Sequence, residues 1–392
     1  MDVYEKSLEL HKEHQGKLEI SVKVPCDTKE DLALAYTPGV AACCLKIDDD
    51  KENAYVYTNK GNTVGIISDG SAVLGLGNIG PSAALPVMEG KAVLMKKFAD
   101  IDAIPLCLNT NDVNEIVSIC KALEPNLGGI NLEDISAPRC IEIERKLVEE
   151  MDIPVFHDDQ QGTAIVVLAT LINSVKLISK KPEECKVVIS GTGAAGSAII
   201  KMIHNYGFKN IYAFDKNGFV SKQNMQSYDK YKKELLNYVN LDNKDYNSIE
   251  EAMVNADIFI GVSVKNLVSK EMVSSMNEKN IVLAMANPEP EISYEDAKSA
   301  GAYIVGTGRS DSFNQVNNLL AFPGIFRGAL DAKATKIDDN AKIAASIALA
   351  NLISDEKLNP EYVVVSPFDE RVVKYVSEAV KKACIKSGNI RG

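Results

Sequence analysis

Apolar and polar positions alternate in blocks along the chain, and from about residue 100 the blocks predict strands and helices in turn. Short apolar runs, each the length of a buried strand, occur at 101–109, 127–134 and 153–159. Longer stretches with apolar positions at helical spacing follow them, at 111–125, 137–151 and 161–181. Repeated strand–helix units of this kind predict a parallel sheet covered by helices.

A second set of strand–helix units fills the rest of the chain. The strand 186–190 leads through a glycine-rich turn into a helix and a strand that ends at Asp215, and later strands are expected at 256–263, 280–288 and 302–308. From Asn314 onward the pattern is largely helical. We therefore predict two α/β domains, one over 1–156 and a Rossmann-type, doubly wound parallel sheet over 157–392, whose C-terminal helices pack back on the first domain.

Composition limits the classes of partner. The 392 residues carry a formal net charge of −11 and no basic run, which argues against nucleic acid or an anionic membrane. No run of about 18 apolar residues is present, and the first residues lack the apolar core of a signal peptide. The eight cysteines form no C-x-x-C pair, so we expect reduced thiols in the cytoplasm rather than a zinc ribbon or a redox dithiol.

The glycine-rich turn is the clearest chemical signal. Gly191, Gly193 and Gly196 form G-x-G-x-x-G between a predicted strand and a predicted helix, where glycine lets a pyrophosphate approach the helix N-terminus. Asp215 ends the next strand, where a carboxylate accepts hydrogen bonds from the adenosine ribose and disfavours a 2′-phosphate. The site is therefore predicted to prefer NAD, although Lys216 leaves NADP open because a lysine can bind a phosphate.

A second G-x-G-x-x-G, at Gly75, Gly77 and Gly80, lacks this context. The next predicted strand carries Asp100 and Asp102 at its beginning, and no acid stands at its end. We interpret this motif as a tight turn near the substrate and not as a second nucleotide site.

Two acidic pairs, Glu133-Asp134 and Asp158-Asp159, each follow a predicted strand. Ligands of open α/β sheets bind at the carboxyl ends of the strands, and carboxylates gathered there repel one another unless a cation neutralises them. Oxygen ligands favour Mg²⁺ or Mn²⁺ over zinc. Either pair alone is as readily a helix N-cap, but two pairs at matching places favour a metal site.

The remaining polar candidates carry little signal by themselves. Lys91 reads as a solvated helix residue, Tyr36 as a turn residue, and His157 as an orienting or core histidine. Asn287 and Asn318 are typical of turns and caps. No Ser-His-Asp or Cys-His set is apparent among the four histidines, so hydrolytic nucleophile chemistry is not supported.

Together and in order, these segments resemble the malic enzyme family, most closely its short bacterial-type branch. The motifs that carry the resemblance span roughly residues 35 to 335 and read AYTPGVA, DGSAVLGLGNIGP, EGKAVLMKKFADIDAIPL, NLEDISAPRC, HDDQQGTAIV, ISGTGAAG, MANPEPE and TGRSDSFNQVNNLLAFPGIFRGALD. The resemblance implies oxidation and decarboxylation of malate to pyruvate with NAD, or with NADP, and a divalent metal. It also implies a homo-oligomer, a dimer or tetramer, in which one subunit's N-terminal segment comes near its neighbour's site.

The resemblance implies a role for each matching residue. The metal ligands of the family match Glu133, Asp134 and Asp159. Lys91 matches the base that takes the C2 hydroxyl proton of malate, Tyr36 the acid that protonates C3, and Asp158 the carboxylate that holds the lysine. Asn287 and Asn318 match residues that contact malate or the nicotinamide end of the cofactor.

These roles require an unusual lysine. A lysine acts as a base only while part of it is neutral, so its pKa must fall toward about 7–8. We expect burial and a nearby Mg²⁺ or Mn²⁺ to lower the pKa of Lys91 by more than Asp158 raises it.

Two alternatives and one departure stay open. Malolactic enzyme resembles the same family but yields lactate, and a non-catalytic dinucleotide sensor would bind NAD without needing Glu133 or Asp159. Ser71-Ala72 stand where longer members of the family carry an arginine that grips malate, so the residue that holds the substrate's carboxylate is not identified.

Overall fold

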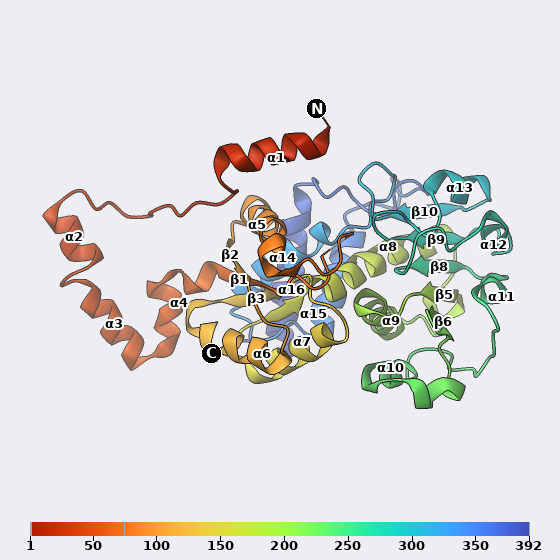
Figure 1. The fold of residues 1–392 in the computed structure, drawn as a ribbon, viewed down its shortest axis with the longest axis horizontal. Coiled ribbons are helices and arrows are strands. Elements are labelled where there is room, and N and C mark those ends of the chain that lie inside the picture. Colours follow the sequence, from red (N-terminus) through yellow and green to blue (C-terminus); the bar gives the residue numbers. More distant parts are fainter. Residues whose placement is uncertain (1, 74, 392) are drawn as a thin grey trace.

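Two sheets covered by helices form the body of the protein in the computed structural model, which describes residues 2–73 and 75–391 (Figure 1). The first sheet has the strand order β2-β1-β3-β4, with β1 (Thr63–Ser68), β2 (Asp102–Cys107), β3 (Gly129–Leu132) and β4 (Val155–His157). All its strands are parallel. The prediction included β2, β3 and β4 but missed β1, although β1 is the strand between β2 and β3.

Helices cover both faces of the first sheet. Successive residues of β1 point to opposite faces, so neighbouring side chains of this strand pack against different helices. Ile66 packs with Met88 of α5 (Gly80–Ala99), whereas Ile67 belongs to a core that includes Ile116 and Ile143. The last two residues lie on α6 (Val113–Leu123) and α7 (Arg139–Glu150). On its face of this sheet, α5 packs against β1 and β2, and the C-terminal helix α14 (Phe322–Asp331) packs beside it.

The second sheet is doubly wound, as predicted. Its strands lie in the order β10-β9-β8-β5-β6-β7, and the bounds are β5 (Lys186–Ser190), β6 (Asn210–Asp215), β7 (Gly218–Phe219), β8 (Ile258–Gly261), β9 (Ile281–Ala284) and β10 (Ile304–Thr307). The short β7 pairs antiparallel with β6, and the other pairings are parallel. One face packs against α8 (Thr163–Leu177) and α9 (Ala194–Tyr206). The other face is covered by α11 (Ile249–Met253), α12 (Lys270–Ser274) and α13 (Tyr294–Ser299).

The C-terminal helices return to the first domain. They are α14 (Phe322–Asp331), α15 (Asp339–Ala350) and α16 (Arg371–Ser387). Helix α14 lies against α5 and α16, and α15 lies against α8. The contact with α16 is close because α14 carries Gly328, where an added Cβ would stand 2.5 Å from the carbonyl oxygen of Ser377.

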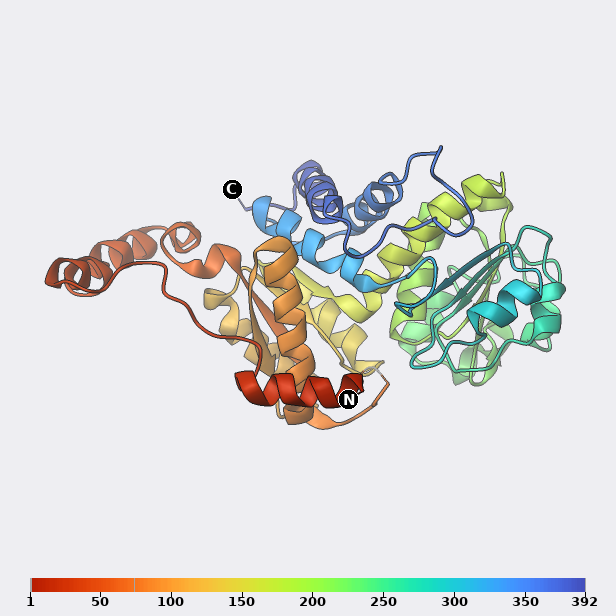
Figure 2. The same cartoon turned by 90° about the horizontal axis from the view of Figure 1, so that it is seen from above.

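The first part of the chain is extended and exposed. Its helices α1 (Val3–His14), α2 (Lys29–Ala35), α3 (Val40–Asp49) and α4 (Ala54–Tyr57) contain no buried residue. Helix α1 lies beside α5, whereas α2 and α3 project from the body in both views (Figures 1 and 2). We call residues 18–57 the N-terminal arm. None of the described helices is both long and apolar enough to cross a membrane.

Candidate active site

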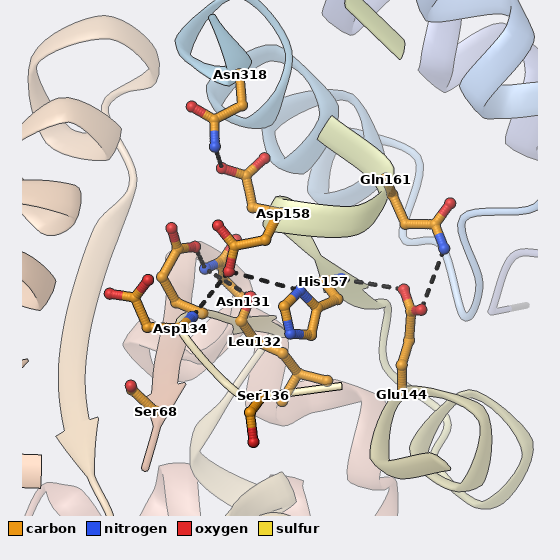
Figure 3. Close-up of polar contacts among 12 residues, drawn as sticks. Ser68, Asn131, Leu132, Asp134, Ser136, Glu144, His157, Asp158, Gln161 and Asn318 are labelled. Carbon is orange, nitrogen blue, oxygen red and sulfur yellow. Dashed lines mark hydrogen bonds and ion pairs between the residues drawn. The ribbon is translucent and has the colours of Figure 1, made fainter. Parts of the chain in front are cut away.

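The two acidic pairs meet at one edge of the first sheet. Because β3 and β4 are neighbours and parallel, the residues that follow them emerge side by side. Glu133 and Asp134 follow β3, and Asp158 and Asp159 open the helical turn η4 (Asp158–Gly162) that leads into α8. The two loops are joined directly, since the backbone N–H of Asp134 donates to Oδ2 of Asp159 over 2.8 Å (Figure 3). The predicted convergence of the acidic pairs is therefore present.

Lys91 lies between these loops and is not the solvated residue that its sequence context indicated. It projects from α5 and is only 8% exposed. Its Nζ donates to Oε1 of Glu133 over 2.8 Å and to the carboxylate of Asp158. The ammonium also lies 4.0 Å from the centre of the Phe322 ring, a favourable cation–π distance. Helix α14 supplies this ring, so the C-terminal helices form one wall of the site.

The charges of the cluster are strongly coupled. Burial raises the pKa values of Glu133 and Asp159, and together with the nearby Glu133 carboxylate it raises the pKa of Asp158 to about 8 despite Lys91. Burial would lower the pKa of Lys91, but the carboxylates of Asp158 and Glu133 outweigh it and raise that pKa. In the protein chain alone the pKa of Lys91 is therefore raised, because two carboxylates and not one hold the ammonium. The expected lowering includes a bound cation and stays a prediction.

Amide side chains complete the inner contacts of the cluster. Nδ2 of Asn318 donates to Oδ2 of Asp158 over 2.6 Å, and Nδ2 of Asn131 donates to Oε2 of Glu133 over 2.9 Å. Asn318 thus reaches the site from the turn that precedes α14, as expected of a residue near the substrate. Asn131 is a contact that the sequence analysis missed.

Glu144 of α7 forms hydrogen bonds to both ends of the segment that carries Asp158 and Asp159. One Glu144 oxygen accepts the backbone N–H of His157 and the other accepts Nε2 of Gln161, each over 3.1 Å (Figure 3). His157 itself is fully buried, as its interpretation as a core histidine requires. Glu144 was missed, although an acid on the buried stripe of an amphipathic helix is a signal that could have found it.

Arg139 was also missed, and it fixes the turn that follows β1. Its guanidinium donates to Asp69 over 2.7 Å, to Ser71 Oγ over 2.9 Å and to Ser136 Oγ over 3.0 Å. It also donates to the carbonyl oxygen of Asn111 over 2.8 Å. With these partners Arg139 links the loops that follow β1, β2 and β3 in the first domain.

The cluster opens onto a cavity of about 550 Å³. Its polar lining consists of Lys17, Lys91, Glu133, Asp134, Asp159 and Asn318. Among the described residues no three acidic, histidine or cysteine side chains already form a metal cage. The carboxylates of Glu133, Asp134 and Asp159 nevertheless line the same cavity.

The glycine turn has the geometry of a dinucleotide site. Gly191 has φ +105°, and a Cβ added there would stand 2.6 Å from the carbonyl oxygen of Val262. A Cβ at Gly196 would stand 1.9 Å from the carbonyl oxygen of Gly191, whereas one at Gly193 would meet nothing within 4 Å. The outer two glycines are thus required by the protein, and Gly193 leaves open the space where a pyrophosphate approaches.

Asp215 ends β6, as predicted, but its carboxylate is engaged. Lys232 of α10 (Lys230–Leu235) forms an ion pair with it, and the backbone N–H of Asn217 donates to it over 2.7 Å. The other glycine motif differs, because Gly75, Gly77 and Gly80 all have positive φ in the turn that leads to α5. That geometry agrees with its interpretation as a tight turn.

Two predicted site residues lie apart from the cluster within one chain. Tyr36 is the C-cap residue of α2, is exposed, and does not line the cavity. Asn287 is exposed beyond the end of β9, at the edge of the second sheet that also carries the glycine turn. The structure thus brings together the lysine and the acidic pairs but leaves the expected proton donor outside.

A doubly wound domain with a dinucleotide turn, joined to a domain with a buried lysine–carboxylate cavity, defines a two-domain dehydrogenase class. Sequence models narrow the class. The malic enzyme N-terminal domain matches residues 15–148, and the malic enzyme NAD-binding domain matches residues 160–386. The chain belongs to the malic enzyme family.

Individual relatives agree with this assignment. The bifunctional malic/malolactic enzyme of Bacillus subtilis is 54% identical over 100% of this chain and 95% of its own length. The NAD-dependent malic enzyme of Geobacillus stearothermophilus is 49% identical over 96% of this chain and 78% of its own length. The crystal structure of malic enzyme from Pyrococcus horikoshii superposes with a TM-score of 0.96 at 44% identity, covering 100% of this chain and 92% of that one.

NADP-dependent proteins are also among the relatives. The NADP-dependent malic enzyme of Rhizobium meliloti is 45% identical over 99% of this chain but only 53% of its own length, so this chain spans about half of that relative. The comparisons therefore establish an NAD(P)-type enzyme family without deciding between the two cofactors.

Proposed function

We propose that the protein oxidises (S)-malate with NAD and a divalent metal and decarboxylates the product to pyruvate and CO₂. The observation that carries this proposal is the buried contact of Lys91 with Glu133 and Asp158 beside a cavity lined by further carboxylates. A general base serves the oxidation of a 2-hydroxy acid, and an adjoining cation held by oxygen ligands would supply the positive charge that favours decarboxylation of the keto acid.

Glu133, Asp134 and Asp159 are the residues that would hold Mg²⁺ or Mn²⁺. The donor set fits, because all three are carboxylates that line the same cavity and burial raises the pKa values of Glu133 and Asp159. Groups that resist carrying charge in the protein alone are stabilised as anions by a hard cation. When bound, the ion supplies positive charge to the C1 carboxylate and C2 oxygen of malate.

The proton chemistry falls to Lys91 and Tyr36. Lys91 accepts the C2 hydroxyl proton, and Asp158 and Asn318 fix its position through a chain of two contacts. Since Asp158 and Glu133 raise the pKa of Lys91, it becomes a base only when the charge of Glu133 is neutralised. Tyr36 then donates a proton to C3 after CO₂ has left.

The exposed position of Tyr36 leads us to propose a homodimer in which the N-terminal arm of one subunit reaches its neighbour's cavity. The arm exposes apolar side chains that a soluble monomer would normally bury, among them Ile20, Val22, Leu34 and Leu45. Light scattering tests this proposal, with about twice the 42.5 kDa chain mass expected for the dimer.

For the cofactor we propose that NAD is preferred and NADP is accepted. The carboxylate of Asp215 at the end of β6 supports NAD. Lys232, which pairs with Asp215, and the neighbouring Lys216 place positive charge where a 2′-phosphate would lie. The ratio of kcat/KM for the two cofactors is the measurement that decides this point.

A second outcome has specific support, because the Bacillus subtilis relative is described as both a malic and a malolactic enzyme. One assay separates the two reactions. Malate, NAD and Mn²⁺ are incubated with the enzyme, and NADH, pyruvate and lactate are measured together. The proposal predicts equal amounts of NADH and pyruvate, whereas lactate without net NADH would replace it with the malolactic reaction.

We also propose that the enzyme works in the cytoplasm. All eight cysteines are free thiols, four of them buried, which suits a reducing compartment. Cell fractionation with an antibody against the protein tests this location.

A further inference from the structure

Lys17 faces the same cavity as Lys91, and none of the roles above uses it. These two lysines are the only cations among the described residues that line the cavity. Lys17 follows α1, and both its backbone and its side chain form hydrogen bonds to α5. Its backbone N–H donates to Oε2 of Glu89 over 3.0 Å, and its Nζ donates to the carbonyl oxygen of Pro86 over 2.8 Å.

The face of α5 that lines the cavity connects the two lysines. Val87, Gly90, Lys91 and Leu94 all line it, and their spacing of three and four residues places them on one side of the helix. The carbonyl of Pro86 lies five residues before Lys91, which is roughly 7 Å along the helix axis. A small dicarboxylic acid bound on this face would extend from one ammonium toward the other.

The ammonium of Lys17 has donors to spare. A lysine carries three donors, and only the neutral carbonyl of Pro86 is bonded to Nζ among the described residues. The Glu89 carboxylate accepts the backbone N–H of Lys17 and raises the pKa of its ammonium, whereas the Nζ atom itself donates to Pro86. Burial lowers that pKa, so this cation is partly desolvated and gains from an anionic partner.

Arg139 is not available for the same task. Its guanidinium is committed to Asp69, Ser71 and Ser136, and it does not line the cavity. Of the two cations among the described residues that line the cavity, Lys91 is already paired with acids, which leaves Lys17 for the charge of the substrate.

We propose that Lys17 binds the C1 carboxylate of malate and thereby determines specificity for this substrate, an inference that rests on the proposed function. The fate of the two carboxylates during the reaction indicates that Lys17 binds C1 and not C4. The C4 carboxylate leaves as neutral CO₂, so a cation paired with it would stabilise the reactant more than the transition state. The C1 carboxylate keeps its charge from malate to pyruvate, so a lysine can hold it throughout.

The test compares substitutions that separate charge from anchoring. Lys17→Gln keeps a donor for the Pro86 carbonyl but removes the charge, Lys17→Arg keeps the charge, and Lys97→Gln on the exposed face of α5 is the matched control. For Lys17→Gln we expect the KM for malate and the inhibition constant of pyruvate each to rise about 10- to 100-fold, the loss of one charge-assisted hydrogen bond. The kcat value and the KM for NAD stay near those of the wild type, and Lys17→Arg restores most of the affinity.

Several results would overturn the assignment. An unchanged KM for malate in Lys17→Gln would show that Lys17 does not contact the substrate. An equal rise of that KM in Lys17→Gln and Lys17→Arg would show that Lys17 only holds the segment after α1 against α5. A weaker malate interaction with unchanged pyruvate inhibition moves the contact to C4. If the wild type neither oxidises malate nor binds it in a calorimeter with Mn²⁺, the proposed function fails and the inference fails with it.

Discussion

Lys91 is held in a buried position by ion pairs with acidic side chains. A lysine on a helix is normally exposed, and burying one is costly unless an acid pairs with it. Glu133 and Asp158 supply that pairing from two different loops, and Phe322 covers the ammonium from a third direction. The residue is therefore already in contact with the acids through which it would exchange a proton.

Replacing Lys91 separates its chemical role from its packing role. Lys91→Ala is expected to lower kcat for malate by about 10²- to 10⁴-fold, the usual contribution of a general base, while the KM for NAD stays unchanged. Steady-state kinetics measure both quantities, and Lys97→Ala on the exposed face of the same helix is the control. A Lys91→Ala enzyme with full turnover would remove the lysine from the mechanism.

At this scale the sequence predicted the acids better than their partners. Glu133, Asp134, Asp158 and Asp159 follow strands, and the ends of neighbouring parallel strands must lie together. The buried stripe of α7 could have drawn attention to Glu144, but its partners His157 and Gln161 could not be predicted, because they depend on which face of α7 meets the HDDQQ segment.

The turn between β5 and α9 is the element with the sharpest steric demands. A Cβ at Gly196 would collide with the Gly191 carbonyl, whereas one at Gly193 meets no protein atom. Gly196→Ala should therefore lower the free energy of unfolding by about 1–3 kcal/mol through overpacking. Gly193→Ala should leave stability within about 0.5 kcal/mol and weaken NAD binding, because its methyl group occupies the space of the pyrophosphate.

Urea unfolding and NAD titration of both variants check these expectations. The pair serves as its own control, since the same substitution is made three residues apart. Equal losses of stability in the two variants, or NAD affinity unchanged in Gly193→Ala, would contradict the assignment of this turn.

Helix α10 joins the two domains through Glu234. Arg145 of α7 donates to both oxygens of Glu234, over 2.7 and 2.5 Å, and Lys201 of α9 lies 3.2 Å away. Hydrogen bonds from Arg145 lead the effects that lower the pKa of Glu234 to about 2. A carboxylate with a lowered folded-state pKa stabilises the fold above its ordinary pKa of about 4.5, and that stability is lost as pH falls toward 2.

Glu234→Gln is thus expected to lower the free energy of unfolding by less than about 1 kcal/mol at pH 7, since these side chains are about 40% exposed and solvent screens them. The difference from the wild type should shrink at pH 3. Urea unfolding at the two pH values measures it. A difference that grows on acidification would mean that Glu234 acts otherwise than as an anion.

Among the elements, the parallel strands of the second sheet were predicted and β1 was not. The strands β8 and β9 read IFIG and IVLA, and β10 continues the apolar run AYIV, so each gives the mostly apolar signal of a strand buried on both faces. Strand β1 is equally buried, but it begins at Thr63, contains Gly65 and ends at Ser68, so its apolar run is short. Its place is fixed by pairing with β2 and β3, which a local pattern does not contain.

The N-terminal arm is the part of the whole molecule that one chain does not explain. Helices α2 and α3 project from the body (Figure 1) and contain no buried residue, and Tyr36 at the end of α2 is exposed. The sequence identified Tyr36 by resemblance but could not indicate where the arm lies, because in the proposed homodimer the arm packs against a second copy of the chain. A second copy would both cover the arm and complete the cavity.

Mixed dimers test whether Tyr36 acts across subunits. Lys91→Ala and Tyr36→Phe subunits are each expected to be nearly inactive alone, but a mixed dimer regains one site that holds both residues. Equal mixing and re-association should therefore restore about a quarter of wild-type activity, since half of the dimers are mixed and each has one working site. No recovery after confirmed exchange of subunits would show that Tyr36 acts within its own chain or not at all.

We propose that the carboxylates around Lys91 bind a cation on which malate oxidation depends. The most direct measurement is the initial rate of NADH formation from malate as Mn²⁺ is titrated into chelator-treated enzyme, for the wild type and for Glu133→Gln. We expect a saturating dependence on Mn²⁺ in the wild type and at least about a 10-fold higher half-saturating concentration in Glu133→Gln. A rate that does not depend on Mn²⁺, or the same titration curve for both proteins, would contradict it.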